Sequence, residues 1–244
     1  MEAEKRIAIL IDADNISDKY IKIILDETAK SGIATYKRIY GDWTNPQLAS
    51  WKAVLLDNSI IPIQQYSYTK GKSSTDSAMI IDAMDILYSG TVDGFCIVSS
   101  DSDFTRLVAR LREAGKYVVG MGESKTPKPF ISACNQFKYL DLLAKSADKP
   151  EISKEIKQSR NNTEQKHFRR VIRNIAMECS DDDGWIFSAE LKNQLTKRYP
   201  DFDERNFGFI KFTPFVESLG VFEVRRERTS AGNNVQLVYF RVKQ

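Results

Sequence analysis

The sequence predicts an α/β fold, namely a three-layer, doubly wound parallel sheet followed by a small α+β winged helix-turn-helix domain. Over residues 1–143, short apolar runs typical of strands alternate with amphipathic helical patterns, and the strand runs are apolar on both faces. Further along the chain, three helical patterns precede two strands joined by a turn. We therefore expect domains at residues 1–143 and 166–244, with a linker at 144–165.

The first domain is expected to contain five strands and four helices in alternation. The strand segments are 6–11 (RIAILI), 34–40 (ATYKRIY), 60–66 (IIPIQQY), 94–99 (GFCIVS) and 116–121 (KYVVGM). The helical segments are 17–32, 45–59, 74–90 and 103–115, and several of them start at Ser or Asp and end at Gly. A helix after each strand but the last is what a parallel sheet requires.

The linker is polar and charged, with few apolar residues. The helical patterns after it cover residues 166–179, 188–199 and 204–220, and the strands cover 221–228 and 234–242 around the turn TSAGNN. Four phenylalanines in the last helical pattern, Phe207, Phe209, Phe212 and Phe215, are spaced for a helix buried in the core. Three helices followed by a hairpin indicate a winged helix-turn-helix.

The composition is that of an ordinary globular protein, with 42% hydrophobic and 28% charged residues in 244. The three cysteines, Cys96, Cys134 and Cys179, lack the spacing of a zinc site or a disulfide framework. The apolar run before Asp12 is too short for a signal peptide or a membrane span. We therefore expect a soluble, intracellular protein located in the cytoplasm.

Aspartates follow two of the expected strands and begin two of the expected helices. Asp12 and Asp101 end strands, whereas Asp76 and Asp103 stand at helix starts. Both kinds of position lie at the same edge of a parallel sheet, so the four side chains are expected to converge. Four carboxylates in one pocket repel each other unless a cation is bound, and oxygen ligands without His or Cys favour Mg²⁺ or Mn²⁺. The only histidine, His167, lies just past the linker.

Each of these residues also has a purely structural interpretation. An Asp at a strand-to-helix junction is often a helix cap, and capping is the alternative for each of the four. Asp82 is expected either to support the metal ligands without contacting the ion or to have a structural role, and Asp14 and Asp85 are expected to face solvent. Two lysines, Lys70 and Lys72, and two serines, Ser99 and Ser100, are candidates for contact with a phosphate. Their alternatives are a solvated loop for the lysines and plain turn formation for the serines.

Three blocks of the first domain carry a resemblance to a known family. The segments IDADN, KGKSSTDSAMIIDAMD and IVSSDSDFTRLVARLREAGKYVVGMG resemble the signature blocks of the NYN family of PIN-like domains. Asp12, Asn15, Asp76, Asp101 and Asp103 match the family pattern position by position. The resemblance implies a metal-dependent endoribonuclease fold in which these residues form the catalytic site and the carboxylates bind Mg²⁺ or Mn²⁺.

The C-terminal segment GWIFSAELKNQLTKRYPDFDERNFGFIKFTPFVESLGVFEV is similar to the OST-HTH/LOTUS domain. This resemblance implies a winged helix that binds RNA or docks a protein partner. Residues 166–244 contain 14 Lys and Arg against 11 Asp and Glu, whereas residues 1–143 contain 17 against 18. Three arginines on the expected hairpin, Arg225, Arg226 and Arg228, are therefore the candidates for RNA binding.

Three functions remain open on the sequence alone. The first is a metal-dependent ribonuclease, cleaving single-stranded RNA, with an RNA-binding C-terminal domain. The second is a catalytically silent RNA-binding or adaptor protein, against which the complete set of carboxylates argues. The third is a phosphatase of the haloacid dehalogenase type, because IDADN contains Asp-x-Asp, but Asn15 stands where such enzymes usually have Thr or Gly. The sequence favours the first.

Overall fold

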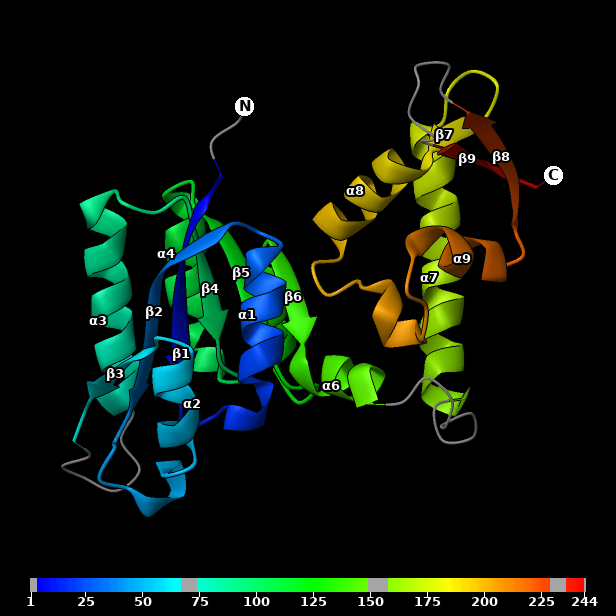
Figure 1. The fold of residues 1–244 in the computed structure, drawn as a ribbon. Coiled ribbons are helices and arrows are strands. Elements are labelled where there is room, and N and C mark those ends of the chain that lie inside the picture. Colours follow the sequence, from blue (N-terminus) through cyan, green and yellow to red (C-terminus); the bar gives the residue numbers. More distant parts are fainter. Residues whose placement is uncertain (1–3, 67–73, 149–157, 229–235, 244) are drawn as a thin grey trace. The chain divides into compact units, whose positions relative to one another are not determined.

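The structure is a computed structural model that describes residues 4–66, 74–148, 158–228 and 236–243 (Figure 1). It contains two compact units, Met1–Lys145 and Ser146–Gln244, and each is described by itself. Helices α6 (Leu140–Asp148) and α7 (Gln158–Cys179) extend into the range 144–165 that we expected to be linker. Leu143 is buried, and Ala144 packs against the core of the first unit, which explains why α6 continues there. No helix in the described part of the chain is long and apolar enough to cross a membrane.

The first unit is built on a six-stranded sheet in which neighbouring strands are parallel. The strands are β1 (Arg6–Asp12), β2 (Ile33–Gly41), β3 (Ile61–Gln64), β4 (Gly94–Val98), β5 (Tyr117–Gly122) and β6 (Gln136–Tyr139). Their order is β3-β2-β1-β4-β5-β6. The five expected strands are present. The sixth, β6, was missed because its four residues, QFKY, are too few and too polar to form a recognisable apolar run.

Helices cover both faces of this sheet, which confirms the three layers expected from the sequence (Figure 1). One face packs against α3 (Ser74–Ser89), α4 (Thr105–Glu113) and α5 (Lys128–Ala133), and the other against α1 (Ile21–Ala29), α2 (Trp51–Asp57) and α6. Along β1, Ala8 and Leu10 belong to the first core, whereas Ile9 and Ile11 belong to the second. Since successive side chains point to opposite faces, a strand buried on both faces is apolar throughout.

The strand order reverses between β1 and β4. The chain runs outward from β1 through β2 to β3, and then begins the other half of the sheet at β4. In open α/β sheets, ligands bind outside the carboxyl ends of the strands at such a point. Ile11 pairs with Val98, so β1 and β4 end at the same level. The two Asp-x-Asp segments therefore leave the sheet side by side, at the place where a ligand site is expected.

The second unit combines helices with a small antiparallel sheet, as expected for a winged helix-turn-helix. Its α-helices in the described residues are α7, α8 (Ser188–Arg198) and α9 (Phe212–Ser218). Its strands are β7 (Trp185–Phe187), β8 (Phe222–Arg228) and β9 (Gln236–Val242), in the order β7-β9-β8. The core is formed by Ile172 and Ile175 of α7, Leu191 and Leu195 of α8, and Phe240 of β9, among others.

The expectation of one continuous helix over residues 204–220 is wrong. A short 3₁₀ helix, Glu204–Phe207, ends at Gly208, whose φ of 85° lies in the left-handed region, and α9 starts only at Phe212. Glycine adopts this conformation without the steric cost that other residues incur. The phenylalanines nevertheless form a core, as expected: the rings of Phe207 and Phe209 lie 5.0 and 5.5 Å from that of Phe215.

Candidate metal centre

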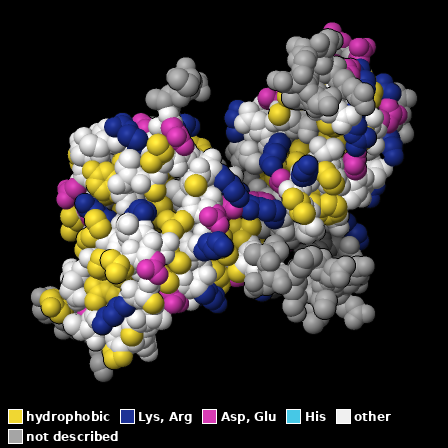
Figure 2. Space-filling view, viewed as in Figure 1, with side chains coloured by type: hydrophobic (Ala, Val, Ile, Leu, Met, Phe, Trp, Pro, Cys, Tyr) yellow, Lys and Arg dark blue, Asp and Glu magenta, His cyan; other side chains and the backbone are white. Residues whose placement is uncertain are grey.

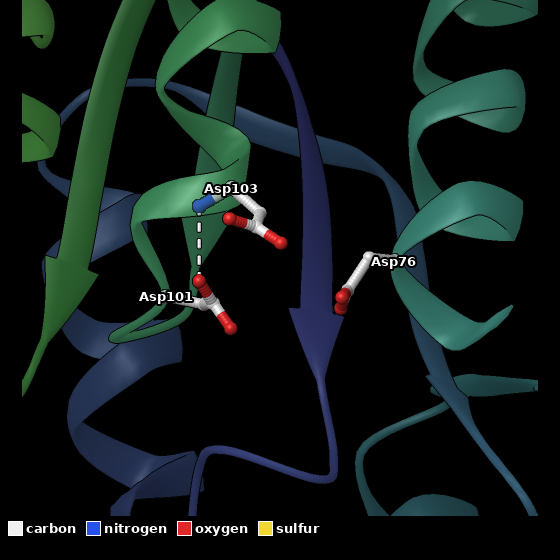
Figure 3. Close-up of side chains that lie close together, drawn as sticks. All are labelled: Asp76, Asp101 and Asp103. Carbon is white, nitrogen blue, oxygen red and sulfur yellow. Dashed lines mark hydrogen bonds between the residues drawn. The ribbon is translucent and has the colours of Figure 1, made fainter. Parts of the chain in front are cut away.

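Three of the four candidate carboxylates lie together at the carboxyl end of the sheet (Figure 3). Asp76 belongs to the first turn of α3, Asp101 follows β4, and Asp103 lies in the 3₁₀ helix Ser102–Phe104 that precedes α4. One carboxylate oxygen of each lies within 4.8 Å of the other two. Asp76 and Asp101 are half-buried and Asp103 is exposed, so the cluster is open to solvent. Segments distant in the sequence thus present acidic oxygens to one point.

Asp101 also caps the short helix that follows it. Its backbone is extended, and its Oδ1 accepts a hydrogen bond of 2.9 Å from the backbone N–H of Asp103. Asp101 thus has the capping role expected of an Asp at a strand-to-helix junction. A carboxylate has two oxygens and about four acceptor positions, so one cap bond does not exhaust its capacity. Capping fixes the orientation of Asp101 and is compatible with metal binding by the same side chain.

Asp12 is not one of these three residues and is fully buried. Its Oδ2 accepts hydrogen bonds from Ser99 Oγ and Asn15 Nδ2, both at 2.7 Å, and its Oδ1 accepts one from the backbone N–H of Asp14 at 3.1 Å. Burial raises the pKa of Asp12 above its ordinary value, and the bonds from Ser99 and Asn15 oppose that shift. The metal-binding role expected for Asp12 stays a prediction, and the structure adds these internal partners.

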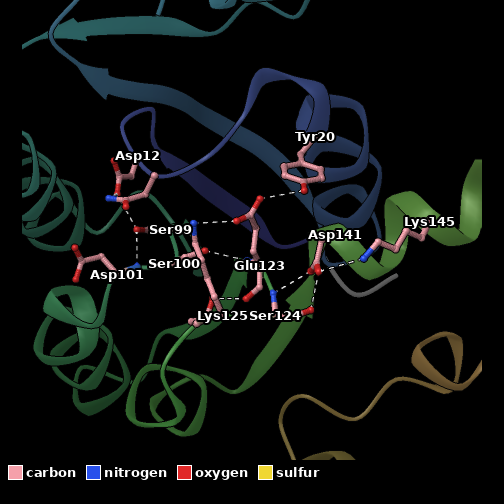
Figure 4. A network of polar contacts seen from close by, with 12 residues as sticks. Asp12, Tyr20, Ser99, Ser100, Asp101, Glu123, Ser124, Lys125, Asp141 and Lys145 are labelled. Atoms are coloured by element: carbon pink, nitrogen blue, oxygen red, sulfur yellow. Dashed lines mark hydrogen bonds and ion pairs between the residues drawn. The ribbon is translucent and has the colours of Figure 1, made fainter. Parts of the chain in front are cut away.

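Ser99 connects Asp12 to the carboxylate cluster (Figure 4). Its hydroxyl donates to Asp12 and accepts a bond of 3.0 Å from the backbone N–H of Asp101. The Ser100 hydroxyl accepts a bond of 2.9 Å from the backbone N–H of Glu123. Both serines are buried, which favours turn formation over phosphate contact. A Cβ at Gly122 would lie 2.6 Å from the Ser99 carbonyl oxygen, so glycine is needed for β5 to approach this turn.

Glu123 is a strand-end carboxylate that the sequence analysis missed. It follows β5, accepts a hydrogen bond of 3.1 Å from the Tyr20 hydroxyl and pairs with Lys125 at 3.0 Å (Figure 4). Burial alone would raise the pKa of Glu123, but the bonds from Lys125 and Tyr20 outweigh it and hold the pKa below its usual range. Burial, together with this hydrogen bond, raises the pKa of Tyr20 to about 12. The position directly after a strand was the signal that could have identified Glu123.

Asp82 attaches helix α3 to strand β2. Its carboxylate accepts hydrogen bonds from the Arg38 guanidinium and the Tyr40 hydroxyl. Burial, reinforced by Asp82, raises the pKa of Tyr40 well above its usual value, so the hydroxyl remains a donor. The structural role expected for Asp82 is therefore confirmed. Asp85, on the same helix, is exposed, as expected.

Replacement of Ser99 by Ala is expected to lower the free energy of unfolding by about 1–3 kcal/mol, because it leaves Asp12 and a backbone N–H short of a partner. Thermal or denaturant unfolding of the first unit measures this loss. Ser102→Ala is the matched control: Ser102 is exposed in the same loop, so a change within about 0.5 kcal/mol is expected. Equal stability of both variants would show that the bridge contributes nothing.

The arginines of the expected RNA-binding hairpin are paired with carboxylates. Arg225 forms an ion pair of 3.0 Å with Glu227, and Arg226 pairs with Glu217. Arg228 belongs to β8, but its side chain lies outside the described residues. The pairs offset the positive charge of Arg225 and Arg226, which weakens the case for them as the main attraction for RNA.

The lysines expected to contact phosphate, Lys70 and Lys72, lie outside the described residues. Elsewhere on the surface, Figure 2 shows basic and acidic side chains interspersed over the visible face. Such mixing produces no field of a single sign on that face. On that face, attraction for a polyanion would therefore have to come from a local group of cations.

Two family models match the chain, and one curated relative overlaps it. The NYN domain model matches residues 6–141, and the OST-HTH/LOTUS domain model matches residues 160–233. The chain is 27% identical over 125 residues to the uncharacterized protein MJ0482 of Methanocaldococcus jannaschii, covering 50% of this chain and 49% of that protein. The chain thus spans about half the length of this curated relative.

Two solved structures are similar to parts or all of the chain. One is the crystal structure of a protein of unknown function, VPA0982, from Vibrio parahaemolyticus, with 20% identity, a TM-score of 0.47, and coverage of 56% of this chain and 93% of that one. The other is the crystal structure of scyllo-inositol dehydrogenase from Lactobacillus casei. It has 11% identity and a TM-score of 0.30, and the alignment covers 97% of this chain and 69% of that one.

The family matches agree with the fold and with the resemblances seen in the sequence. The NYN match includes every strand of the parallel sheet, and the OST-HTH/LOTUS match begins in α7 and extends past β8. NYN domains are PIN-like nucleases and OST-HTH/LOTUS domains bind RNA, which points to a nuclease or RNA-binding role. Since the first match covers more than half of the sequence, the chain belongs to the NYN domain family and carries a C-terminal OST-HTH/LOTUS domain.

Proposed function

We propose that this protein is a metal-dependent ribonuclease that cleaves single-stranded RNA endonucleolytically, and that its C-terminal domain binds the RNA. The observation that carries the proposal is the convergence of Asp76, Asp101 and Asp103 at the strand-order switch. The NYN match supports the choice of a nuclease over other hydrolases. The cluster is open to solvent on the side of Asp103, as an RNA chain would require.

The donor set fits Mg²⁺ or Mn²⁺. All three side chains offer hard anionic oxygens, the type of ligand that these ions prefer. Opposite ligands of a Mg²⁺ ion lie about 4.2 Å apart, given ligand distances of about 2.1 Å. The three oxygens already lie within 4.8 Å of one another, so only small side-chain movements separate the observed arrangement from a ligand set.

A divalent ion held there supplies positive charge for the phosphate oxygens and lowers the pKa of a bound water. The protein's own residues supply the rest of the arrangement. Asp76, Asp101 and Asp103 hold the ion, and the cap bond from Asp103 to Asp101 limits how far Asp101 can turn. Asp12, which we expect to be a further ligand, accepts the bond from Ser99 and so helps to hold the turn that carries Asp101.

Circular, labelled single-stranded RNA tests this proposal. The full-length protein is expected to convert the circle into linear fragments with Mn²⁺ or Mg²⁺, because an endonuclease needs no free end. EDTA is expected to stop the reaction, and excess Mn²⁺ to restore it, since the carboxylates provide no other electrophile for the developing charge. Cleavage that persists in EDTA would contradict the metal dependence. Circles that stay intact with metal would contradict the nuclease activity and favour a catalytically silent RNA-binding protein.

A further inference from the structure

A basic groove of about 520 Å³ lies on the C-terminal unit. One wall is α7, and the other is formed by the turn at Gly220 and Val221 and by the end of the chain after β9. Its cations are Lys166, Arg169, Arg170, Arg173 and Lys243. No carboxylate is among its described lining residues. Neither the expected hairpin arginines nor the carboxylate cluster belongs to this groove.

The four cations of α7 form a stripe along one side of the helix. Positions 166, 169, 170 and 173 follow the spacing i, i+3, i+4 and i+7, which places them on one face. All four are exposed, whereas Ile172 and Ile175 on the opposite face are buried in the core. At about 1.5 Å per residue, the stripe is about 10 Å long. The helix is thus anchored by its apolar face and presents a rigid row of positive charge.

The groove cations differ from the other arginines of this unit in their partners. Among the described residues, none of Lys166, Arg169, Arg170 and Arg173 forms an ion pair, and Lys243 only donates a hydrogen bond of 3.3 Å to the Gly220 carbonyl. Exposed charges of one sign held this close repel one another, and no carboxylate among the described residues forms an ion pair with the four cations of α7. An anionic ligand would remove it.

By contrast, two arginines of strands β8 and β9, Arg225 and Arg241, already contact aromatic rings or a carboxylate. Arg225 lies over the rings of Trp185 and Tyr239, at 4.6 and 5.0 Å from their centroids. Arg241 lies 4.7 Å from the Trp185 centroid and donates a bond of 2.9 Å to Glu223. These aromatic and acidic contacts would have to be broken or shared before either guanidinium could bind a phosphate fully.

We infer that the groove between α7 and the Gly220 turn is where this protein binds the phosphate backbone of RNA. The inference rests on the proposed function and names the surface that serves it. An elongated row of cations fits a polymer that carries one phosphate after another better than it fits a single small anion. Arginine is suited to the task, because its guanidinium can donate two parallel hydrogen bonds to one phosphate.

Two triple variants with the same change in net charge test this assignment. The groove variant is Arg169→Gln, Arg170→Gln and Arg173→Gln, and the hairpin variant is Arg225→Gln, Arg226→Gln and Arg241→Gln. Binding of labelled single-stranded RNA to the full-length proteins is measured by fluorescence anisotropy in EDTA, over a range of salt concentrations. Circular dichroism and melting curves establish that both variants fold.

The groove variant is expected to bind RNA about tenfold or more weakly at low salt, and the slope of log K against log salt to fall by about 2, at about 0.7 per lost phosphate contact. The hairpin variant should change by less than about twofold. Equal losses in both variants would show a mere effect of net charge and overturn the inference. Unchanged binding by the groove variant would also overturn it and point to an acidic protein as the occupant. The cleavage assay tests the proposed function separately: if the proposed function is wrong, the wild-type protein shows no Mn²⁺-dependent cleavage.

Discussion

Replacement of Asp101 by Asn is expected to lower the rate of metal-dependent RNA cleavage by about 10²- to 10³-fold while the protein stays folded. Asparagine has the same shape, and its side-chain oxygen can still accept the cap bond from the backbone of Asp103. What it loses is the negative charge that attracts the cation. The measurement is single-turnover cleavage of gel-purified RNA, with each variant purified in parallel.

Asp85→Asn provides the matched control for this experiment. Asp85 is an exposed carboxylate on α3, the same helix as Asp76, but it is not part of the cluster. Full activity of Asp85→Asn beside an inactive Asp101→Asn would assign the loss to the cluster rather than to net charge. An Asp101→Asn protein that retains the wild-type rate would rule out the cluster as the catalytic centre.

The second large effect is on thermal stability. At a Mn²⁺ concentration 100 times the dissociation constant, binding to the native state adds about 2.7 kcal/mol to the free energy of unfolding. We expect the first unit of the wild type to melt several degrees higher with Mn²⁺ than in EDTA. Asp101→Asn should melt slightly above the wild type in EDTA, because one of three mutually repelling charges is gone, and should gain much less from Mn²⁺.

Differential scanning calorimetry across a Mn²⁺ titration distinguishes these cases. Asp85→Asn again serves as the control and should follow the wild-type curve. Parallel curves for the wild type and Asp101→Asn would show that Asp101 is not a ligand. Ca²⁺ and Mg²⁺ titrations on the same proteins compare the metals directly, since the cluster consists only of oxygen ligands.

The centre of the parallel sheet was predictable because β1, β4 and β5 are apolar runs that are buried on both faces. The short strand β6 and the division of residues 204–220 were not predictable in the same way. In β6, only Phe137 is fully buried, and at Gly208 a single left-handed residue interrupts a pattern that otherwise reads as helical. Periodicity reports burial over several turns and is insensitive to one backbone angle.

The convergence of Asp76, Asp101 and Asp103 could be anticipated, because strand ends and helix starts share one edge of a parallel sheet. The hydrogen bonds that Asp12 accepts could not, because one of the donors, Ser99, lies far from Asp12 in the sequence. The ion pair between Arg225 and Glu227 was likewise not predictable, since a count of charged residues does not show which of them form ion pairs.

The attachment of Asp82 to Arg38 and Tyr40 has a consequence for the carboxylate cluster. Asp82 lies six residues after Asp76, about 9 Å along the axis of α3. The bonds from β2 therefore resist sliding or rotation of α3, and with it displacement of the Asp76 oxygens. A homologous chain that keeps all three aspartates but has lost the tyrosine or the arginine of β2 would retain the ligands without their alignment. Whether such a chain could catalyse the reaction therefore depends on these residues of β2 as well as on the three aspartates.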